Sequence, residues 1–327
     1  MGTTEGPGNG KLKIAMYWAL SCGGCDISLL EIGPRILDLI QIADVVFWPC
    51  AADFKYQDVV NYPDGFMDVC FFNGGVRNSE QEEIARLLRK KSKTLIGYGA
   101  CAGDGGIPAL ANLKSRAEIF DAAYHHNPSI DNRARIEPQP TTDTPMGQLE
   151  IPEFYPAVLR LKDIVPIDYE IPGCPPQADR VWEAIQAVAT GAVPPQNHAV
   201  KVGCSEKTVC EECPREKKLV KIKAFRRHHE FRPEPGWCLL EQGILCMGPA
   251  TRSGCGALCL KADMRCEGCY GSPAKAEDQG TSMIGALGAL VDAQTEDRAR
   301  ELVAQIADPT GTFYRFSLSS SFLKVAK

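Results

Sequence analysis

The sequence predicts an α/β protein built on a doubly wound parallel sheet, joined to an irregular region that is rich in loops. Short apolar segments alternate with helical patterns from residue 12 to residue 191, which is typical of strand–helix units in a parallel sheet. Between Cys238 and Cys269 glycine, proline and small residues replace any sustained period, and six of the 15 cysteines fall within this stretch. It has few large apolar side chains to bury, so bound metal is the expected source of its stability.

Five apolar segments are predicted to be strands, because each combines β-branched or aromatic residues with a turn signal at its end. They span residues 12–19, 43–50, 67–76, 93–101 and 165–174. Their alternation with helices predicts a flavodoxin-like, doubly wound sheet, in which ligands bind at the carboxyl edge.

Helical patterns lie between and after these strands. One spans residues 26–40 and should end or kink at Pro34. A second spans residues 79–91, with Ser79 as a suitable N-cap and with acidic residues preceding basic ones. A third runs from the prolines after Cys174 to Gly191, and a fourth covers residues 280–307 with an interruption near residues 292–294.

The chain is expected to form two domains. Residues 1–195 would make the flavodoxin-like domain and residues 196–327 the cysteine-rich domain. A loop-rich stretch at 122–166 is either a surface loop or an interface, with Ile151, Phe154 and Tyr155 as anchors for a partner chain. His125 and His126, at its start, are expected on the surface.

A basic run at residues 217–232 is interpreted as a solvated or subunit-facing helix, with an electrostatic docking patch as the alternative.

Composition excludes several classes of protein. The net charge is −5, so a nucleic-acid partner is not expected. No run of eighteen apolar residues occurs, so no membrane span is expected. The polar start of the chain lacks the apolar core of a secretory signal and lacks a twin-arginine pair, which predicts a cytoplasmic location with reduced thiols.

Reduced thiols in this number require a function other than disulfide formation. Zinc ribbons are the first alternative, but they need two C-x2-C pairs at ribbon spacing. Here the spacings are irregular, and Cys22, Cys25, Cys101 and Cys174 are spread over about half of the chain. Soft thiolate ligands in this pattern favour iron–sulfur clusters.

The positions of those four cysteines are informative, because each lies just past the end of a predicted strand. Parallel strands place their carboxyl ends at one edge, so the four thiolates should converge there and hold one [4Fe–4S] cluster. Glycines next to them would let the backbone approach a bulky group. A nucleotide-binding loop is the alternative for GYGACAGDGG, but its glycines do not give G-x-G-x-x-G.

Several blocks in order resemble the small subunit of [NiFe] hydrogenases. They are SCGGC after the first strand, GACAGDGGI after the fourth, IPGCPP after the fifth, and C-x7-C-x8-C followed by C-x2-C. The resemblance covers essentially the whole chain. It implies three clusters that carry electrons away from a Ni–Fe centre in a separate large subunit.

The resemblance also implies the ligands of each cluster. The proximal cluster would be held by Cys22, Cys25, Cys101 and Cys174, the medial cluster by Cys255, Cys259, Cys266 and Cys269, and the distal cluster by Cys210, Cys213, Cys238 and Cys246. All three would be [4Fe–4S]. Of the cysteines left over, Cys50 and Cys70 are expected to be buried structural thiols, and Cys204 could replace Cys210 or Cys213.

Within the family, the all-cysteine set and CSEKTVCEECPREK resemble the cytoplasmic archaeal group that reduces methyl viologen but not the deazaflavin coenzyme. This resemblance implies a small [2Fe–2S] adaptor and heterodisulfide reductase as further partners. A sibling that reduces the deazaflavin or NAD(P) is an alternative. A subunit of a complex-I-like quinone oxidoreductase and a zinc-stabilised scaffold are the others.

The resemblance places dihydrogen chemistry on the partner chain. The R-x-C-x-x-C and D-P-C-x-x-C motifs that hold nickel in the large subunit do not occur here. No nucleophile–base pair stands out, so no catalytic residue is expected in this chain.

Overall fold

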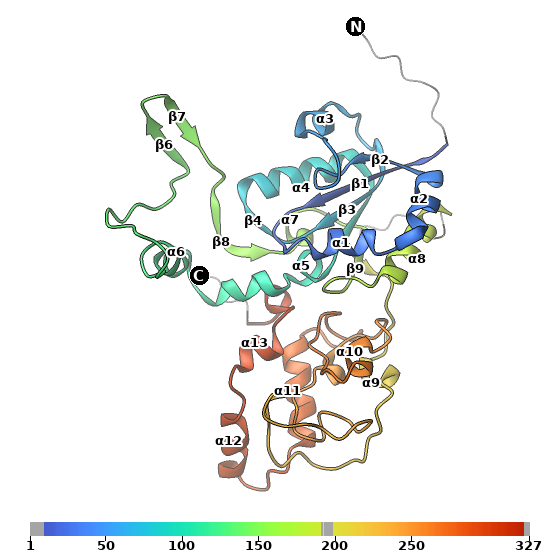
Figure 1. The fold of residues 1–327 in the computed structure, drawn as a ribbon, viewed down its shortest axis with the longest axis vertical. Helices are drawn as coiled ribbons and strands as arrows, with labels where there is room; N and C mark the ends of the chain where they lie inside the picture. The colour runs from blue at the N-terminus through green and yellow to red at the C-terminus, as the bar shows by residue number, and fades with distance from the viewer. Residues whose placement is uncertain (1–9, 191, 193–198, 324–327) are drawn as a thin grey trace.

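The structure is a computed structural model that describes residues 10–190, 192 and 199–323. Figure 1 shows a sheet with its helices in one part and the cysteine-rich region below it. The sheet has six strands in the order β10-β9-β5-β3-β1-β2, and every neighbouring pair is parallel. This confirms the α/β class with a parallel central sheet. The strands are β1 Leu12–Trp18, β2 Ala43–Phe47, β3 Met67–Asn73, β5 Ser92–Tyr98, β9 Tyr169–Ile171 and β10 Val200–Lys201.

Successive side chains of each strand enter two different cores, as the twofold strand period requires. Met16 packs with one core and its neighbour Ala15 with the other, and Phe71 and Phe72 divide in the same way. One core is covered by α1 Gly24–Leu30, α2 Ile36–Ile42 and α8 Ala178–Ala189. The other is covered by α3 Tyr56–Asn61, α4 Ser79–Lys91 and α7 Leu161–Ile164.

Several predicted boundaries differ from the structure. The expected break at Pro34 is confirmed, because a 3-10 turn, Gly33–Arg35, separates α1 from α2, although the helix begins at Gly24 and ends at Ile42 rather than at 26 and 40. The N-cap of α4 is Asn78 rather than Ser79, because the Asn78 side chain accepts a hydrogen bond of 2.8 Å from the backbone N–H of Gln81. The fifth strand is shorter than expected, since only three residues pair in β9.

The cysteine-rich region has little regular structure around its thiols. The short helices α9 Val209–Glu212 and α10 Leu258–Lys261 lie among loops, and α11 Gln279–Leu290, α12 Glu296–Ala304 and α13 Pro309–Phe313 follow. The expected interruption of the C-terminal helix is confirmed, because Thr295 caps the start of α12. The helix expected at 217–232 is wrong: that segment is irregular, with isolated bridges from Ile222 and Arg226 and a turn at 228–230.

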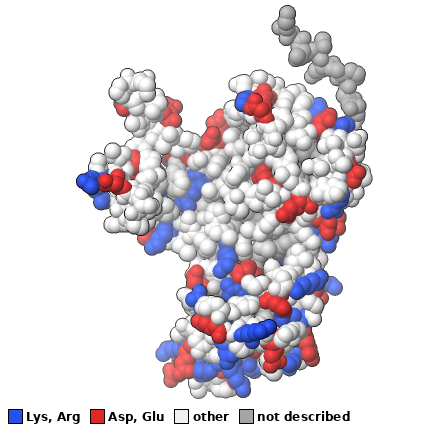
Figure 2. Space-filling view, in the orientation of Figure 1, with Lys and Arg blue, Asp and Glu red and all other residues white. Residues whose placement is uncertain are grey.

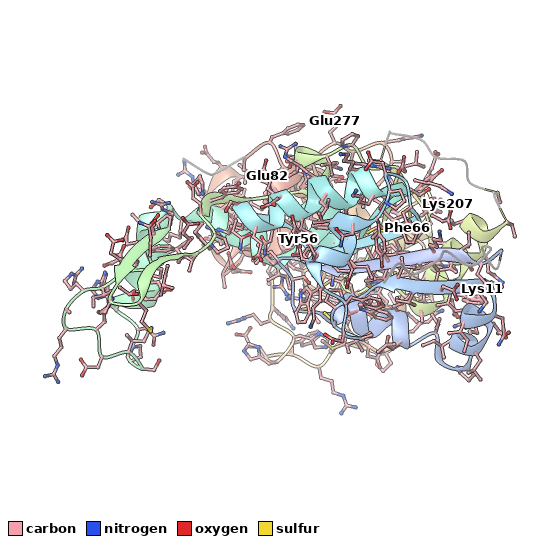
Figure 3. The ribbon with its side chains drawn as sticks, turned by 90° about the horizontal axis from the view of Figure 1, so that it is seen from above. Lys11, Tyr56, Phe66, Glu82, Lys207 and Glu277 are labelled. Atoms are coloured by element: carbon pink, nitrogen blue, oxygen red, sulfur yellow. The ribbon has the colours of Figure 1, made fainter. Side chains whose placement is uncertain are left out.

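A hairpin extends away from the sheet, as the view from above shows (Figure 3). It is made of β6 Thr141–Thr144 and β7 Gly147–Glu150. In the sequence it follows α6 Arg116–Tyr124 and precedes β8 Phe154–Leu159. Strand β8 pairs with β4 Val76–Asn78. Within this expected loop region, the Tyr155 hydroxyl donates to Glu82 at 2.7 Å, and the Phe154 ring lies 5.3 Å from that of Phe120. Two of the three expected anchors therefore pack within this chain.

The expectation that His125 and His126 are both on the surface is wrong for His125. Its side chain is 4% exposed and lies 2.7 Å from Glu137, whereas His126 is exposed.

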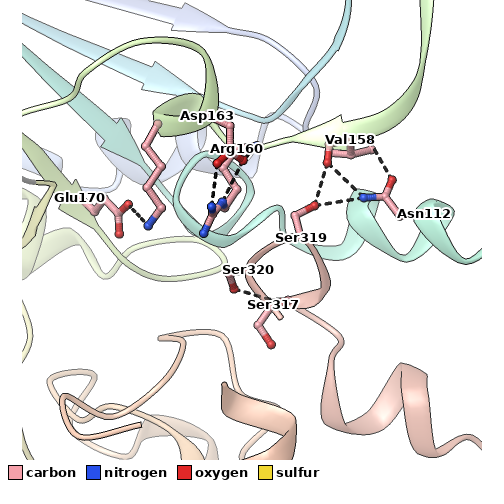
Figure 4. A network of polar contacts seen from close by, with 9 residues as sticks. Asn112, Val158, Arg160, Asp163, Glu170, Ser317, Ser319 and Ser320 are labelled. Carbon is pink, nitrogen blue, oxygen red and sulfur yellow. Dashed lines mark hydrogen bonds and ion pairs between the residues drawn. The ribbon is translucent and has the colours of Figure 1, made fainter. Parts of the chain in front are cut away.

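The C-terminal segment returns to the sheet region and ties the two parts together (Figure 4). Ser319 Oγ donates to the Val158 carbonyl at 2.8 Å, and Asn112 exchanges hydrogen bonds with Val158. The remaining short elements are α5 Ala100–Asp104 and the 3-10 turns Ile107–Leu113, Gly248–Ala250 and Leu318–Ser320. The expected boundary at 195/196 lies outside the described residues, so the division into two domains stays a prediction.

None of the helices in the described part of the chain has the length and apolar character needed to span a membrane.

Candidate metal centre

The four cysteines expected at the carboxyl edge of the sheet lie together there. Cys22 precedes α1, Cys25 lies in α1, Cys101 lies in α5, and Cys174 follows β9. Burial raises the pKa of Cys25 above its usual range, and the charges of the other three thiols raise it further. Burial raises the pKa of Cys101 to about 12, again with contributions from two other thiols of the group. The backbone supports this grouping, because the N–H of Ala100, next to Cys101, donates a hydrogen bond of 2.7 Å to the carbonyl of Gly173, next to Cys174.

Glycines leave room beside these thiols. Gly99 has a φ of 87° and Gly106 a φ of 59°, conformations that L side chains rarely adopt. A Cβ atom at Gly99 would overlap Cys25 Sγ, and one at Gly106 would lie 2.5 Å from Cys101 Sγ. The backbone therefore approaches the sulfur atoms more closely than any other residue type allows.

A second group consists of Cys210, Cys213, Cys238 and Cys246. Burial raises the pKa of Cys210 to about 12, and the largest further contribution comes from Cys246, with smaller ones from Cys238 and Cys213. Backbone N–H groups point at two of these sulfurs: those of Glu241 and Leu240 at Cys238, and those of Gly248 and Cys266 at Cys246. These N–H groups favour the thiolate form, which is the form that binds metal.

The third group lines a cavity of about 430 Å³ that lies between α8 and α10. Cys255, Cys259, Cys266 and Cys269 all border this cavity, and so does Cys174 of the first group. Burial raises the pKa of Cys255. The backbone N–H groups of Ala257 and Leu258 act in the opposite direction, but burial has the larger effect. Burial raises the pKa of Cys269 to about 12, although the backbone N–H of Cys174 acts in the opposite direction.

The thiols of these groups fit a positively charged metal centre. Burial and mutual repulsion make four thiolates costly together, so a positive centre is needed to hold them. Among the described residues, no three His, Cys, Asp or Glu side chains form a site for a single metal ion. Two buried polar atoms of residues that line the cavity of the third group, Gln177 Oε1 and Tyr270 Oη, have no hydrogen-bond partner in the described part of the chain.

The remaining three cysteines belong to none of these groups, although Cys204 lies beside Gly254, the neighbour of Cys255. Cys70 is fully buried in β3, as expected. Cys50 is exposed rather than buried, because β2 ends at Phe47 and leaves it in the following turn. Burial raises the pKa of Cys204, and the charges that act on it come from Arg252, Lys201 and Glu170 rather than from any cysteine.

Two polar residues at the third group were not predicted from the sequence. The Glu212 carboxylate accepts hydrogen bonds from the backbone N–H groups of Gly254 at 3.1 Å and Ala257 at 3.3 Å, on either side of Cys255. Tyr270, which follows Cys269, is 2% exposed and borders the cavity. Both lie within or next to cysteine motifs, but sequence does not indicate which way such side chains point.

Comparison with known proteins identifies the family. The model of the family described as "NADH ubiquinone oxidoreductase, 20 Kd subunit" matches residues 22–188. The iron-sulfur subunit of an F420-non-reducing hydrogenase from Archaeoglobus profundus is 36% identical over 318 residues, which cover 95% of this chain and 98% of that protein. A subunit of the F420-non-reducing hydrogenase from Methanothermobacter thermautotrophicus is also 36% identical, over 96% of each chain. The chain belongs to this hydrogenase family.

Membership in the family confirms the resemblance found in the sequence and makes the chain a hydrogenase subunit of the non-F420-reducing type. The oxidoreductase family model covers only the sheet region, whereas the hydrogenase relatives also cover the cysteine-rich region. The hydrogenase family therefore accounts for more of the chain than the complex-I-like alternative. Among solved structures, the actinobacterial-type NiFe-hydrogenase from Ralstonia eutropha H16 aligns with a TM-score of 0.51 at 16% identity, covering 95% of this chain and 90% of that one, so the fold is shared.

Proposed function

We propose that this chain is the electron-transferring small subunit of a [NiFe] hydrogenase and carries three [4Fe–4S] clusters. The proximal cluster would be held by Cys22, Cys25, Cys101 and Cys174; the medial cluster by Cys255, Cys259, Cys266 and Cys269; and the distal cluster by Cys210, Cys213, Cys238 and Cys246. Such clusters accept and release one electron at a time. The observation that carries the proposal is the gathering of twelve cysteines into three neighbouring groups.

The protein's own part in this function is to hold and order the thiolates. Backbone N–H groups at Cys238, Cys246, Cys255 and Cys269 stabilise negative charge on sulfur. The apolar core around the cysteines limits access of water, which also affects the potentials. Tight packing fixes the distances between the groups, so that electrons would pass in a set order.

The face around Cys22 supports a large subunit as the partner that reacts with dihydrogen. Cys22 is exposed, and so are Ile27 and Leu30 of α1 and Leu37 and Ile40 of α2. Figure 2 shows a broad, mostly uncharged area on this face. Exposed apolar side chains that cluster in this way mark protein–protein contacts.

From the distal cluster, we propose that electrons pass to a small [2Fe–2S] adaptor and then to heterodisulfide reductase. The names of the relatives, which exclude the F420-reducing type, support this destination over a deazaflavin. A NAD(P)-linked acceptor is the alternative.

Anaerobic affinity purification of the tagged chain, with identification of the chains that copurify, tests this proposal. A nickel-containing large subunit with the adaptor and heterodisulfide reductase is the expected result. Ile27→Asp, a change in an exposed residue of α1, should reduce recovery of the large subunit at least tenfold. Val303→Asp is the matched control, because Val303 is similarly exposed but lies on α12. Absence of any nickel-containing partner from the wild-type preparation would contradict the proposal.

A further inference from the structure

Tyr270 is a buried tyrosine beside the third group of cysteines. It follows Cys269 directly and is 2% exposed. Its side chain borders the cavity that is also lined by the four cysteines of the third group. The ring therefore reaches the space that the medial cluster would occupy.

The Tyr270 hydroxyl has no hydrogen-bond partner among the residues that the structure describes. Buried hydroxyl groups are nearly always paired, and leaving one unpaired is costly. The backbone N–H of Gln177 faces the oxygen and lowers the pKa of the phenol, but an N–H can only donate. The hydroxyl proton therefore still needs an acceptor.

The acceptors available in the cavity are the sulfur atoms of the cysteines that line it. Cys255 and Cys269 line the same cavity as Tyr270, and Cys269 is its neighbour in the chain. A phenol, whose ordinary pKa is about 10, is protonated at neutral pH and can act as a donor. When Cys255 and Cys269 are thiolates, they present negative charge to that proton.

We propose that the Tyr270 hydroxyl donates a hydrogen bond to a thiolate of the medial group, Cys255 or Cys269, and thereby raises the reduction potential of the medial centre. Tyr270 is a positioning residue in this role, because it acts through the cysteine ligands. The inference rests on the proposed function, since it requires a redox centre at this site.

The physical reason is that reduction adds negative charge to the sulfur ligands. A donor aimed at a thiolate stabilises the more negative, reduced state. Hydrogen bonds to sulfur are among the established determinants of cluster potential. Removing this donor should therefore make the medial centre harder to reduce, while leaving the other two centres unchanged.

The test is a potentiometric titration of the anaerobically purified complex, followed by electron paramagnetic resonance, for wild type and Tyr270→Phe. The variant keeps the ring and loses only the oxygen. A lower midpoint potential at the medial centre alone is expected. The control is Tyr314→Phe, another buried tyrosine of this region whose hydroxyl is influenced by Thr281 and Asp278 but by no cysteine. It should shift none of the centres.

A second substitution keeps the donor in case Tyr270→Phe loses the cluster. Incorporation of 3-fluorotyrosine at position 270 retains the ring and hydroxyl but makes the O–H a stronger donor, so the medial potential should rise. An unchanged medial potential in either loaded variant would overturn the inference while leaving the proposed function intact. A wild-type complex without iron and acid-labile sulfide would overturn both.

Discussion

The backbone N–H of Cys266 donates a hydrogen bond of 3.3 Å to Sγ of Cys246. One residue belongs to the proposed medial group and the other to the proposed distal group. Cys174, of the proposed proximal group, lines the same cavity as the four cysteines of the proposed medial group. The proposed medial group is therefore next to both of the others.

Cys259 tests the medial ligand set. It borders the same cavity as Cys255, Cys266 and Cys269, and it lies in the first turn of α10, where proline is tolerated. Cys259→Pro should remove one ligand and convert the medial centre to [3Fe–4S], which gives a distinct electron paramagnetic resonance signal when oxidised. Cys259→Ala should behave in the same way if the thiolate, rather than the backbone, is what matters. A spectrum identical to that of wild type would count against this ligand.

Cys204 and Cys210 form a matched pair for the distal site. The charges that act on Cys204 come from no other cysteine, whereas Cys210 is influenced by three. Cys204→Ser should leave all three clusters intact, and Cys210→Ser should lose the distal one. Iron content and reduced-state spectra measure both. Loss of a cluster in Cys204→Ser would mean that the distal set is wrongly assigned.

Glu212 should stabilise the loop that carries Cys255. Its carboxylate accepts from the backbone N–H groups of Gly254 and Ala257, and each partner left unsatisfied costs about 1–3 kcal/mol. Glu212→Leu is therefore expected to release iron from the medial site faster on exposure to a chelator, whereas Glu212→Gln, which keeps one acceptor oxygen, should lie between it and wild type. Glu206→Leu, at an exposed neighbour, is the control. Equal release rates for all variants would exclude this role.

Lys201 joins β10 to the helix that carries Cys101. Its ammonium group lies 2.8 Å from Asp104 and 3.5 Å from Glu170, and all three side chains are largely buried. Lys201→Met would leave two carboxylates without this partner, which should destabilise the protein by about 3–5 kcal/mol. The pair Lys93–Asp68, in which the lysine is 62% exposed, is the control, and Lys93→Met should cost less than about 1 kcal/mol. Thermal unfolding, followed by circular dichroism, compares the two.

The same ion pair has a defined dependence on pH. Burial alone would raise the pKa of Asp104, but Lys201, Lys162 and Arg160 outweigh it and hold the pKa below its usual value. The stabilisation is therefore present above the unfolded pKa of about 3.9 and is lost as the pH falls through the folded pKa. The deficit of Lys201→Met should shrink on acidification, and a constant deficit would contradict the assigned cause.

The sequence was sufficient to predict five strands of the six-stranded sheet, because apolar period and turn signals act locally, but it did not predict the two-residue edge strand β10. It also predicted which cysteines share the edge of the sheet, since parallel strands leave their carboxyl ends together. The same reasoning failed for residues 217–232, where charge content suggested a helix, but the backbone N–H groups of Ile222 and Arg226 donate to the carbonyls of Leu290 and Gly243 instead. Helix propensity does not determine the local structure where tertiary contacts provide the backbone with other hydrogen-bond partners.

The polar residues near the sulfurs could not have been predicted in this way. Asn78 rather than Ser79 caps α4 because only its side chain reaches the N–H of Gln81. Glu212 and Tyr270 depend on the path of loops that follow no period. Their positions are properties of the folded molecule, and no spacing rule reports them.

Iron and acid-labile sulfide, measured together in the anaerobically purified wild-type protein, test the central claim most directly. Three cubane centres, each held by four thiolates, require about twelve iron and about twelve sulfide per chain. This result is what the three groups of cysteines predict. About four of each would leave only one group as a cluster site, and zinc without sulfide would contradict the account as a whole.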